Sequence, residues 1–471
     1  MVFSSIEFLF FFLPAVLIVY YLVPKVAKNW VLLAASLLFY AWGAPDFIFI
    51  FIGSMLCNFF ITKKMHNTEN PRRKKVLLSI SVILNLGILA YFKYMNFFLD
   101  NINALLSITN HNALTFNRIA LPIGISFFTF QSLTYTIDVY RKVSQPLQRW
   151  NDYMLYISLF PQLIAGPIIR YNTIADQLVN RTITMEDRVM GFYRFVIGLG
   201  KKVLIANTVA AVADEIFAMD YASLSSGTAW IGILAYTFQI YFDFSGYSDM
   251  AIGLGRMLGF RFTENFNAPY ISQSISEFWR RWHITLGAFM KEYLYIPLGG
   301  NRVSRARLYF NLGTVFLISG LWHGASWNFV LWGAFHGAFL ILDRIFLLDI
   351  LKKIGRVPAT LFTFFIVALG WVVFRVESIG PAMHYYQALF AFRNGASVAL
   401  SPRFITIFCL AILFSFLPML KTGDHLLQTV FSEHYNKKTT IIMGVLVFLL
   451  FVLSVGALCV TDFNPFIYFR F

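Results

Sequence analysis

The sequence IIMGVLVFLLFVLSVGALCV at residues 441–460 contains no charged side chain. A run of this length matches the roughly 17–25 apolar residues with which one α-helix crosses a bilayer. Similar apolar runs recur along the chain, at Phe8–Val23, Trp30–Trp42, Phe47–Ile61, Val76–Leu99, Ala229–Phe244, Leu308–Leu321, Leu361–Phe374 and Phe404–Leu420. Because lipid offers no hydrogen-bond partner to the backbone, such runs fold as helices. We therefore predict an all-α, polytopic membrane protein with about 11–13 membrane helices, some of them re-entrant or broken, around a central cavity.

The composition indicates the same class. Of the 471 residues, 58% are hydrophobic and 13% are charged, whereas soluble domains carry about 25% charged residues. No soluble extension exceeds the length of an ordinary loop, so we treat residues 1–471 as a single integral-membrane domain and expect its functional site to lie within the helical bundle. The first basic residue is Lys25. The N-terminal run is therefore expected to be a membrane helix rather than a signal peptide.

The net charge of +15 is mainly attributed to Lys and Arg in cytoplasmic loops, most clearly the loop Lys63–Lys75, KKMHNTENPRRKK. The remaining positive charge suits an anionic cosubstrate or anionic lipid head groups. Nucleic-acid binding is not expected, because the basic residues lie between membrane runs rather than on one face of a domain. Cys57, Cys409 and Cys459 all lie within apolar runs, so neither a disulfide framework nor a metal site is expected.

Three segments depart from a simple apolar run. Asp100–Arg118 is polar and is expected to be an extracytoplasmic loop. Leu121–Tyr140 is apolar but contains Pro122 and Gly124, which favours a helix inside the bundle or a broken helix. Phe160–Tyr171 carries two prolines and a glycine. Irregular backbone at membrane depth is tolerated only where protein or a cavity covers it, so this segment is predicted to be re-entrant or cavity-lining.

Three of the eight histidines, His283, His323 and His336, are flanked by Trp, Phe or Gly, whereas the others lie in polar stretches. An imidazole at lipid depth needs a partner or a water-filled cavity. On one continuous helix, His323 and His336 would lie about 220° and roughly 20 Å apart. They are therefore not expected to share a site unless nearby glycines break the helix. An antiparallel helix pair would instead bring His283 to His323.

The stretch 276–300 contains both acidic and basic residues among aromatic ones. Glu277 and Arg281 stand four residues apart and are expected to pair on one helix face. The mixed character predicts an amphipathic helix at the cytoplasmic interface. Arg280 and Arg281 either anchor this helix at the head groups or receive a phosphate-bearing cosubstrate, and the sequence leaves both readings open.

A second polar stretch lies inside an apolar run. Gln239, Asp243 and Tyr247 recur every four residues and form a polar stripe on one helix face. Ionisable residues in membrane helices usually face the interior and are paired. Structural pairing, for example of Asp249 with Arg256, is as good an interpretation here as catalysis.

The motifs WRRWH at 279–283 and GLWHG at 320–324 together resemble the histidine pair of the membrane-bound O-acyltransferase (MBOAT) family. Other stretches fit the branch of this family that serves bacterial alginate O-acetylation, namely MVFSS at 1–5, LPIGISF at 121–127, LIAGP at 163–167, YFDFSGYSDMAIGLG at 241–255, NFNAPYISQSISEFWRRWHITL at 265–286 and the terminal FNPFIYFRF. By this resemblance, His323 is the essential histidine and His283 the second one. His336 fits a common pattern of the branch and receives no catalytic role.

The resemblance implies transfer of acetyl groups from cytoplasmic acetyl-CoA, with no bound cofactor or metal, to an extracytoplasmic polysaccharide such as alginate. His323 would take the hydroxyl proton or carry a transient acyl group, and His283 would polarise the thioester carbonyl or assist proton transfer. The residues expected along the substrate path are Arg280, Arg281, Trp282, Trp322, Gln239, Asp243 and Tyr247. A periplasmic SGNH-type acetyltransferase is the expected partner, and the bacterial cytoplasmic (inner) membrane is the expected location.

Three other functions stay open at this point. Two belong to the same family, namely O-acetylation of peptidoglycan and D-alanylation of teichoic acid. The third is a transporter or flippase, which would also explain ionisable residues inside the membrane. That class predicts inverted repeats with paired discontinuous helices, and the sequence shows neither.

Overall fold

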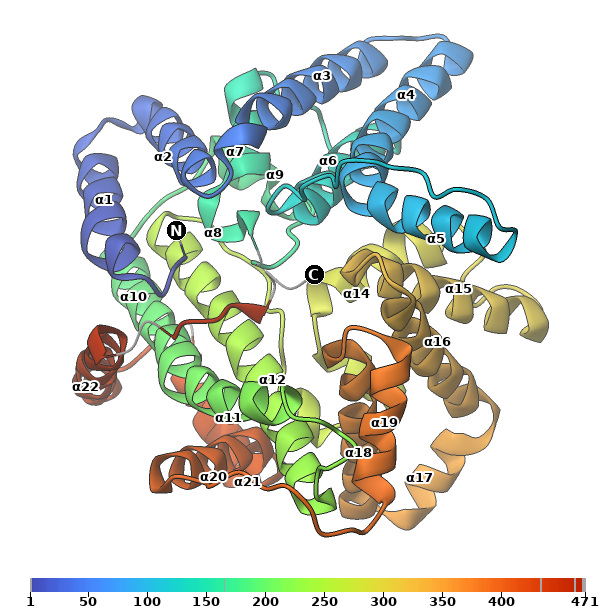
Figure 1. Ribbon diagram of the computed structural model, residues 1–471. Helices are drawn as coiled ribbons and strands as arrows, with labels where there is room; N and C mark the ends of the chain where they lie inside the picture. Colours follow the sequence, from blue (N-terminus) through green and yellow to red (C-terminus); the bar gives the residue numbers. More distant parts are fainter. Residues whose placement is uncertain (1, 165, 433, 461–462, 468–471) are drawn as a thin grey trace. The chain divides into compact units, whose positions relative to one another are not determined.

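The computed structural model describes residues 2–164, 166–432, 434–460 and 463–467. Across these residues the secondary structure is helical, apart from an isolated parallel β-bridge between Leu224 and Ala396. The all-α class is therefore confirmed (Figure 1). The chain forms two compact units, which are Met1–Thr184 with Leu258–Phe262 and Met185–Met257 with Thr263–Phe471. We describe each unit separately.

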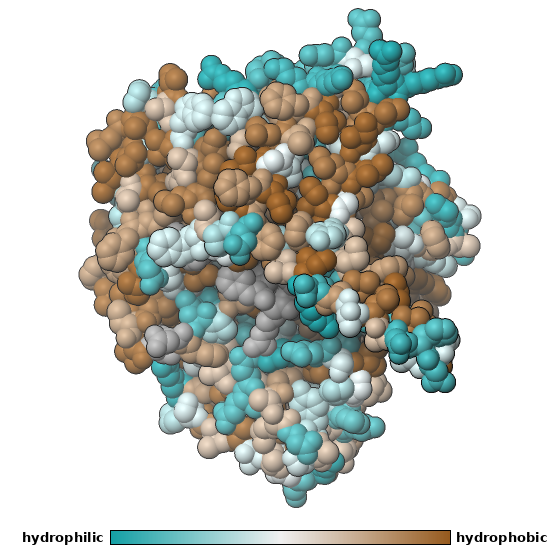
Figure 2. All heavy atoms as spheres, turned by 45° about the horizontal axis from the view of Figure 1, so that its top comes forward, coloured by the Kyte–Doolittle hydropathy of each residue, from teal (hydrophilic) through white to brown (hydrophobic). Residues whose placement is uncertain are grey.

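Seven of the described helical segments are long and apolar enough to cross a membrane, which confirms the polytopic class. They are Lys25–Gly43, Pro45–His66, Pro71–Ile108, Met185–Phe217, Arg356–Arg375, Pro402–Met419 and Lys437–Val460. The number is below the expected 11–13, and one further apolar run falls in the shorter helical segment Phe8–Leu22. Large apolar side chains such as Phe49 and Ile83 are exposed, and Figure 2 shows apolar residues over much of the visible face. Such a surface suits contact with lipid.

The first unit contains the N-terminal helices. They are η1 (Phe8–Phe12), α1 (Leu13–Leu22), η2 (Lys25–Ala27), α2 (Lys28–Gly43), η3 (Pro45–Phe47), α3 (Ile48–His66), α4 (Pro71–Leu89), η4 (Ala90–Tyr94), α5 (Met95–Ile108), α6 (Ile125–Tyr140), α7 (Trp150–Ser158), α8 (Phe160–Leu163) and α9 (Tyr171–Val179). Helix α6 begins directly after Gly124, whose φ is +75°, and is buried along nearly its whole length. The expectation of an interior helix in this region is confirmed, and Pro122 and Gly124 precede the helix instead of breaking it.

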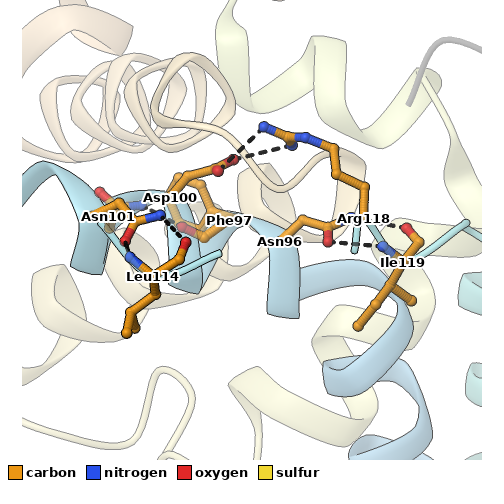
Figure 3. A network of polar contacts seen from close by, with 8 residues as sticks. Asn96, Phe97, Asp100, Asn101, Leu114, Arg118 and Ile119 are labelled. Atoms are coloured by element: carbon orange, nitrogen blue, oxygen red, sulfur yellow. Dashed lines mark hydrogen bonds and ion pairs between the residues drawn. The ribbon is translucent and has the colours of Figure 1, made fainter. Parts of the chain in front are cut away.

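The segment expected as an outer loop, Asp100–Arg118, is only partly a loop, because α5 continues to Ile108. The chain after α5 folds back along it through polar contacts (Figure 3). Asn96 exchanges two hydrogen bonds with the backbone of Ile119, at 2.8 and 3.0 Å. The Arg118 guanidinium also pairs with Asp100 at 3.2 Å. Polar residues in this stretch therefore fasten a helix and its return segment together.

The expected re-entrant element at 160–171 consists of the single turn α8 followed by irregular backbone. Its described residues are buried up to Ile169, and Tyr156 donates a hydrogen bond to the Ile169 carbonyl at 2.9 Å. Protein therefore covers the described part of this irregular backbone, as the sequence predicted.

The second unit contains the remaining helices. They are α10 (Met185–Gly200), η5 (Lys201–Ala206), α11 (Asn207–Phe217), α12 (Ser226–Met257), η6 (Pro269–Ile271), α13 (Ile275–Arg281), α14 (Ile284–Phe289), η7 (Met290–Tyr295), α15 (Arg305–His323), α16 (Trp327–Leu342), η8 (Asp343–Leu347), α17 (Leu348–Ile354), α18 (Arg356–Arg375), α19 (Ile379–Phe390), α20 (Pro402–Phe416), η9 (Leu417–Met419), α21 (Lys421–Val430) and α22 (Lys437–Val460). Helix α12 packs against α10, α11, α18 and α19, so it is the central helix of this unit.

Helices α10 and α12 pack side by side (Figure 1), and glycines of the two helices face each other at their contact. A Cβ atom on Gly198 would lie 2.5 Å from the Gly246 carbonyl oxygen, and one on Gly253 would lie 2.5 Å from the Gly191 carbonyl oxygen. Small residues that allow such contact are typical of packed membrane helices. This contact fixes the register between the two helices.

Asp249 on α12 is paired, as the sequence suggested, but with different partners. Its carboxylate accepts from Arg194 Nε at 2.7 Å and lies 2.6 Å from Lys201 Nζ. Arg256 instead contacts Asp187 at 3.3 Å. The expected pairing of Asp249 with Arg256 is wrong, because basic residues of α10 and η5 lie closer to this carboxylate than Arg256 of its own helix does.

Candidate active site

His283 lies at a break between α13 and α14. Its backbone has φ +46° and ψ +52°, the left-handed conformation, which costs a non-glycine residue about 1–3 kcal/mol. The stretch 276–300, which was expected to form an amphipathic helix, is therefore helical but interrupted at this residue. Sequence-based reasoning missed this break because no glycine or proline marks it. Strain of this kind persists only where the surroundings fix the backbone, which indicates that the position of this imidazole is strongly constrained.

Asn265 provides that constraint, and its side chain was not predicted as a site residue. Its backbone carbonyl accepts from the Ile284 N–H at 2.9 Å. Its Oδ1 accepts from the Thr285 N–H at 3.2 Å and from the Thr285 hydroxyl at 2.8 Å, and it lies 3.1 Å from His283 Nδ1. Asn265, in the irregular segment between α12 and η6, thus holds the chain at and just after the helix break.

These contacts also determine the tautomer of His283. Since a backbone N–H can only donate, the Asn265 atom that binds Thr285 is the carbonyl oxygen, and His283 Nδ1 must carry the proton toward it. The other ring nitrogen, Nε2, then holds the lone pair. Burial lowers the pKa of His283 to about 3, so the ring is neutral near pH 7. His283 therefore presents a proton-accepting nitrogen.

His323 is the last residue of α15, and the chain turns immediately after it. Gly324 is extended, and α16 begins at Trp327. A Cβ atom on Gly320 would lie 2.2 Å from the Phe329 carbonyl oxygen, so the α15–α16 hairpin requires glycine there. The break that the sequence analysis allowed between the two histidines of this region is present, and the chain folds back on itself.

The hairpin and the α13–α14 break bring the two expected histidines together. The ring centroids of His283 and His323 are 6.4 Å apart. Trp322 packs against both rings, with centroids at 6.0 Å from His283 and 4.9 Å from His323. Both histidines are buried, at 1% and 6% exposure. The predicted juxtaposition of His283 and His323 is therefore confirmed as geometry.

His336 is separated from His323 by the Trp332 side chain. The Trp332 ring contacts both His323 and His336, with centroids at 5.1 and 5.0 Å. The Trp279 indole N–H donates to His336 Nδ1 at 3.4 Å. His336 is therefore a packing and hydrogen-bonding partner of the tryptophans that surround His323.

A small cavity adjoins His323. Its lining is almost entirely aromatic or aliphatic and consists of Ile240, Phe244, Trp282, His323, Trp332, Trp371, Phe374 and Ile467. The cavity volume is about 10 Å³, the space of roughly one water molecule. An apolar wall of this kind excludes water and strengthens electrostatic interactions inside it.

The expected path residues at the end of α13 are placed differently from one another. Trp282 lines the cavity. Arg281 pairs with Glu277 at 2.8 Å, as predicted, and also donates to the Asn267 carbonyl. Arg280 is exposed. Of the two arginines, Arg280 therefore has the accessibility that binding of an anionic ligand needs.

The polar stripe on α12 faces the last described segment of the chain. Asp243 pairs with Lys202 at 2.8 Å and accepts from the Ile467 N–H at 2.8 Å. Tyr247 stacks on Phe466, with centroids 4.6 Å apart. Gln239 is buried on the same helix. The sequence contained no signal for Lys202, because it lies far from Asp243 along the chain.

A metal site was not expected, and the described residues contain no group of three or more His, Cys, Asp or Glu placed to hold a metal ion. The three cysteines are free and exposed.

Comparison with known proteins places this geometry in a family. The sequence model of the membrane-bound O-acyltransferase family, MBOAT, matches residues 74–348. The chain is 41% identical to a probable alginate O-acetylase of Azotobacter vinelandii over the full length of both chains. It is 46% identical to a probable alginate O-acetylase of Pseudomonas aeruginosa, over 83% of this chain and 75% of the relative. It is also 39% identical to a peptidoglycan O-acetyltransferase of Helicobacter pylori, over 84% and 81% respectively.

Proposed function

Because the chain belongs to the membrane-bound O-acyltransferase family, we propose that this multi-pass bacterial membrane protein moves acetyl groups from cytoplasmic acetyl-CoA to an extracytoplasmic polysaccharide, with alginate as the first candidate. The names of the relatives with 41% and 46% identity support alginate. The observation that carries the proposal is the pair His283 and His323, 6.4 Å apart beside a water-excluding cavity. The proposal treats residues 1–471 as one catalytic domain in the cytoplasmic membrane.

In the proposed reaction, the acceptor oxygen forms a bond to the acetyl carbon and the carbon–sulfur bond of the thioester breaks. His323 takes the acceptor proton, and the departing thiolate leaves as CoA and receives a proton. A neutral imidazole suits this role because its ordinary pKa of about 6.5 allows it to gain and lose a proton near neutrality. A covalent acyl group on His323 is the ping-pong variant of the same proposal.

The tautomer of His283 bears on its own role. A group that polarises a carbonyl must donate a hydrogen bond, whereas His283 Nε2 carries a lone pair and Nδ1 is engaged with Asn265. Of the two roles considered, assistance in proton transfer therefore fits better than polarisation of the thioester carbonyl. His283 Nε2 would accept a hydrogen bond from the group that carries the proton, while His323 takes the proton itself.

The remaining path residues receive different roles. Arg280 is exposed and would meet the phosphates of acetyl-CoA. Trp282 and Trp322 would enclose the acetyl group, since both pack at the histidine pair. Gln239, Asp243 and Tyr247 lie on the buried face of α12. Asp243 and Tyr247 would act indirectly, by holding the segment 463–467 in place.

A periplasmic SGNH-type acetyltransferase is the proposed partner that completes delivery to the polymer. Peptidoglycan is the alternative acceptor, supported by the 39% identity to the peptidoglycan O-acetyltransferase of Helicobacter pylori. Teichoic acid D-alanylation would use a different acyl group and is tested by the choice of donor. A transporter would move a solute without turning over a thioester.

The test uses purified protein with acetyl-CoA labelled in the acetyl group. Wild type is expected to release CoA and transfer label, and His323→Ala is expected to lose this activity while its level in the membrane is retained. The matched control is His384→Ala, because His384 is exposed on α19 and should leave the activity unchanged. Acetyl transfer by His323→Ala at nearly the wild-type rate would overturn the assignment, and solute flux without thioester turnover would favour a transporter.

A further inference from the structure

The segment 463–467 is anchored inside the second unit by a buried ion pair. Lys202 Nζ lies 2.8 Å from Asp243 Oδ1, and the two side chains are 3% and 2% exposed. Lys202 also donates to the Pro465 carbonyl, and Asp243 Oδ2 accepts from the Ile467 N–H at 2.8 Å. A buried ion pair is tolerated when further hydrogen bonds satisfy its remaining polar positions. Backbone groups of this segment provide two of those hydrogen bonds.

Side chains of the same segment reinforce this anchoring. Phe466 stacks on Tyr247 of α12, with ring centroids 4.6 Å apart. The Asn207 amide donates to Asn464 Oδ1 at 3.2 Å. Phe466 and Ile467 are 6% and 3% exposed. The segment 463–467 therefore packs in a defined position against α12, η5 and α11.

This packing places Ile467 in the wall of the cavity that adjoins His323. Most of the other lining side chains are aromatic and project from helices or helix ends. Ile467 and Ile240 are the two aliphatic members of the lining. Ile467 differs from the other lining residues because its position depends on the backbone hydrogen bonds that Lys202 and Asp243 make with its segment.

We propose that Ile467 is a specificity-determining residue, whose side chain limits the size of the acyl group that can reach His323. This inference rests on the proposed acetyl transfer. A cavity of about 10 Å³ has room for roughly one water molecule beside the imidazole, so the wall must already move to admit an acetyl group, and each added carbon of the acyl group must displace a wall side chain further. One methylene in an apolar pocket changes discrimination by about 10–200-fold, which is enough to separate acetyl from propionyl donors.

The experiment compares acetyl-CoA and propionyl-CoA as donors for purified full-length protein. Ile467→Ala removes most of the wall side chain and should raise the propionyl-to-acetyl ratio of kcat/KM by about 10–200-fold. Ile467→Val removes one methyl group and should raise the ratio by a smaller factor. The matched control is Ile441→Ala, because Ile441 is 69% exposed on α22, and this variant should keep the wild-type ratio.

The outcomes separate this inference from the proposed function. An unchanged ratio in Ile467→Ala, with acetyl transfer retained, would overturn the role of Ile467 but leave acetyl transfer in place. If Ile467→Ala does not accumulate in the membrane, Ile467→Val decides, because Ile-to-Val changes cost only about 0.5–1.5 kcal/mol of stability. Absence of CoA release and of acetyl transfer in the wild-type protein would instead refute the proposed function.

Discussion

Asn265 offers a sharp test of how the site is organised, because one of its atoms supports both the fold and the chemistry. The perturbation is Asn265→Leu, which keeps a similar volume but removes the acceptor oxygen. Three hydrogen bonds are then lost, at 3.1 Å to His283 Nδ1, 3.2 Å to the Thr285 N–H and 2.8 Å to the Thr285 hydroxyl. Without this acceptor, no hydrogen bond favours the His283 tautomer that carries its proton on Nδ1.

The expected magnitude follows from these contacts. A buried donor left without a partner costs about 1–3 kcal/mol, and 1.4 kcal/mol corresponds to a factor of ten. Loss of the His283 contact should therefore reduce the competent tautomer, and with it kcat/KM for acetyl transfer, by about 5–150-fold. The two lost contacts to Thr285 should lower stability in addition.

The assay is release of CoA from acetyl-CoA by purified protein, together with thermal unfolding in detergent. Thr285→Val is the matched control, because it removes the hydroxyl contact to Asn265 and leaves the His283 contact in place. It should lower stability with little effect on kcat/KM. A wild-type kcat/KM in Asn265→Leu, or equal rate losses in both variants, would refute the reasoning about the tautomer.

Three further predictions concern stability and pH. Gly370→Ala places a Cβ atom 2.8 Å from His336 Nε2 and should cost about 1–3 kcal/mol of stability by overpacking, whereas Gly380→Ala, with open space around it, should cost less. Lys202→Met leaves Asp243 charged and unpaired, so it should lower stability by about 3–5 kcal/mol, and addition of Asp243→Leu should restore part of the loss; thermal unfolding measures both effects. Burial lowers the pKa of the histidine between α13 and α14 from 6.5 to about 3, so the unfolded chain binds its proton first as the pH falls. Stability should therefore decline below about pH 6.5, and the decline should be less steep in the variant in which glutamine replaces this histidine. The thermal-unfolding midpoint measured as a function of pH checks this. A wild-type midpoint that rises on acidification relative to that of the glutamine variant would contradict it.

Much of the fold could be predicted because apolar runs and lipid leave few alternatives. The helical class, the interior position of α6 and the covered irregular backbone after α8 all follow from local composition. The break at His283 did not follow, because an αL conformation at a non-glycine residue depends on tertiary contacts with Asn265. The extension of α5 into the polar stretch after Asp100 was missed for a similar reason, since its polar residues are satisfied by the returning chain.

The site was predictable to the extent that motifs mark it. His283 and His323 stand in motifs of the family, and the structure places their rings together. Asn265 lies 18 residues before His283, within the polar stretch TENFN at 263–267, so its polarity did not distinguish it from its neighbours. Lys202 and Ile467 lie much farther apart in sequence, and pairing of Lys202 with Asp243 requires knowledge of which helices pack together. Long-range contacts of this kind leave no local pattern.

The central claim is that His283 and His323 act as one catalytic unit, and a double-mutant cycle tests it most directly. His283→Gln, His323→Gln and the double variant are compared for acetyl-CoA turnover at high protein concentration. Residues that act as a unit show strongly non-additive effects. We predict that the double variant is no slower, within a few-fold, than the slower single variant. Losses that multiply as for two independent sites would contradict the claim.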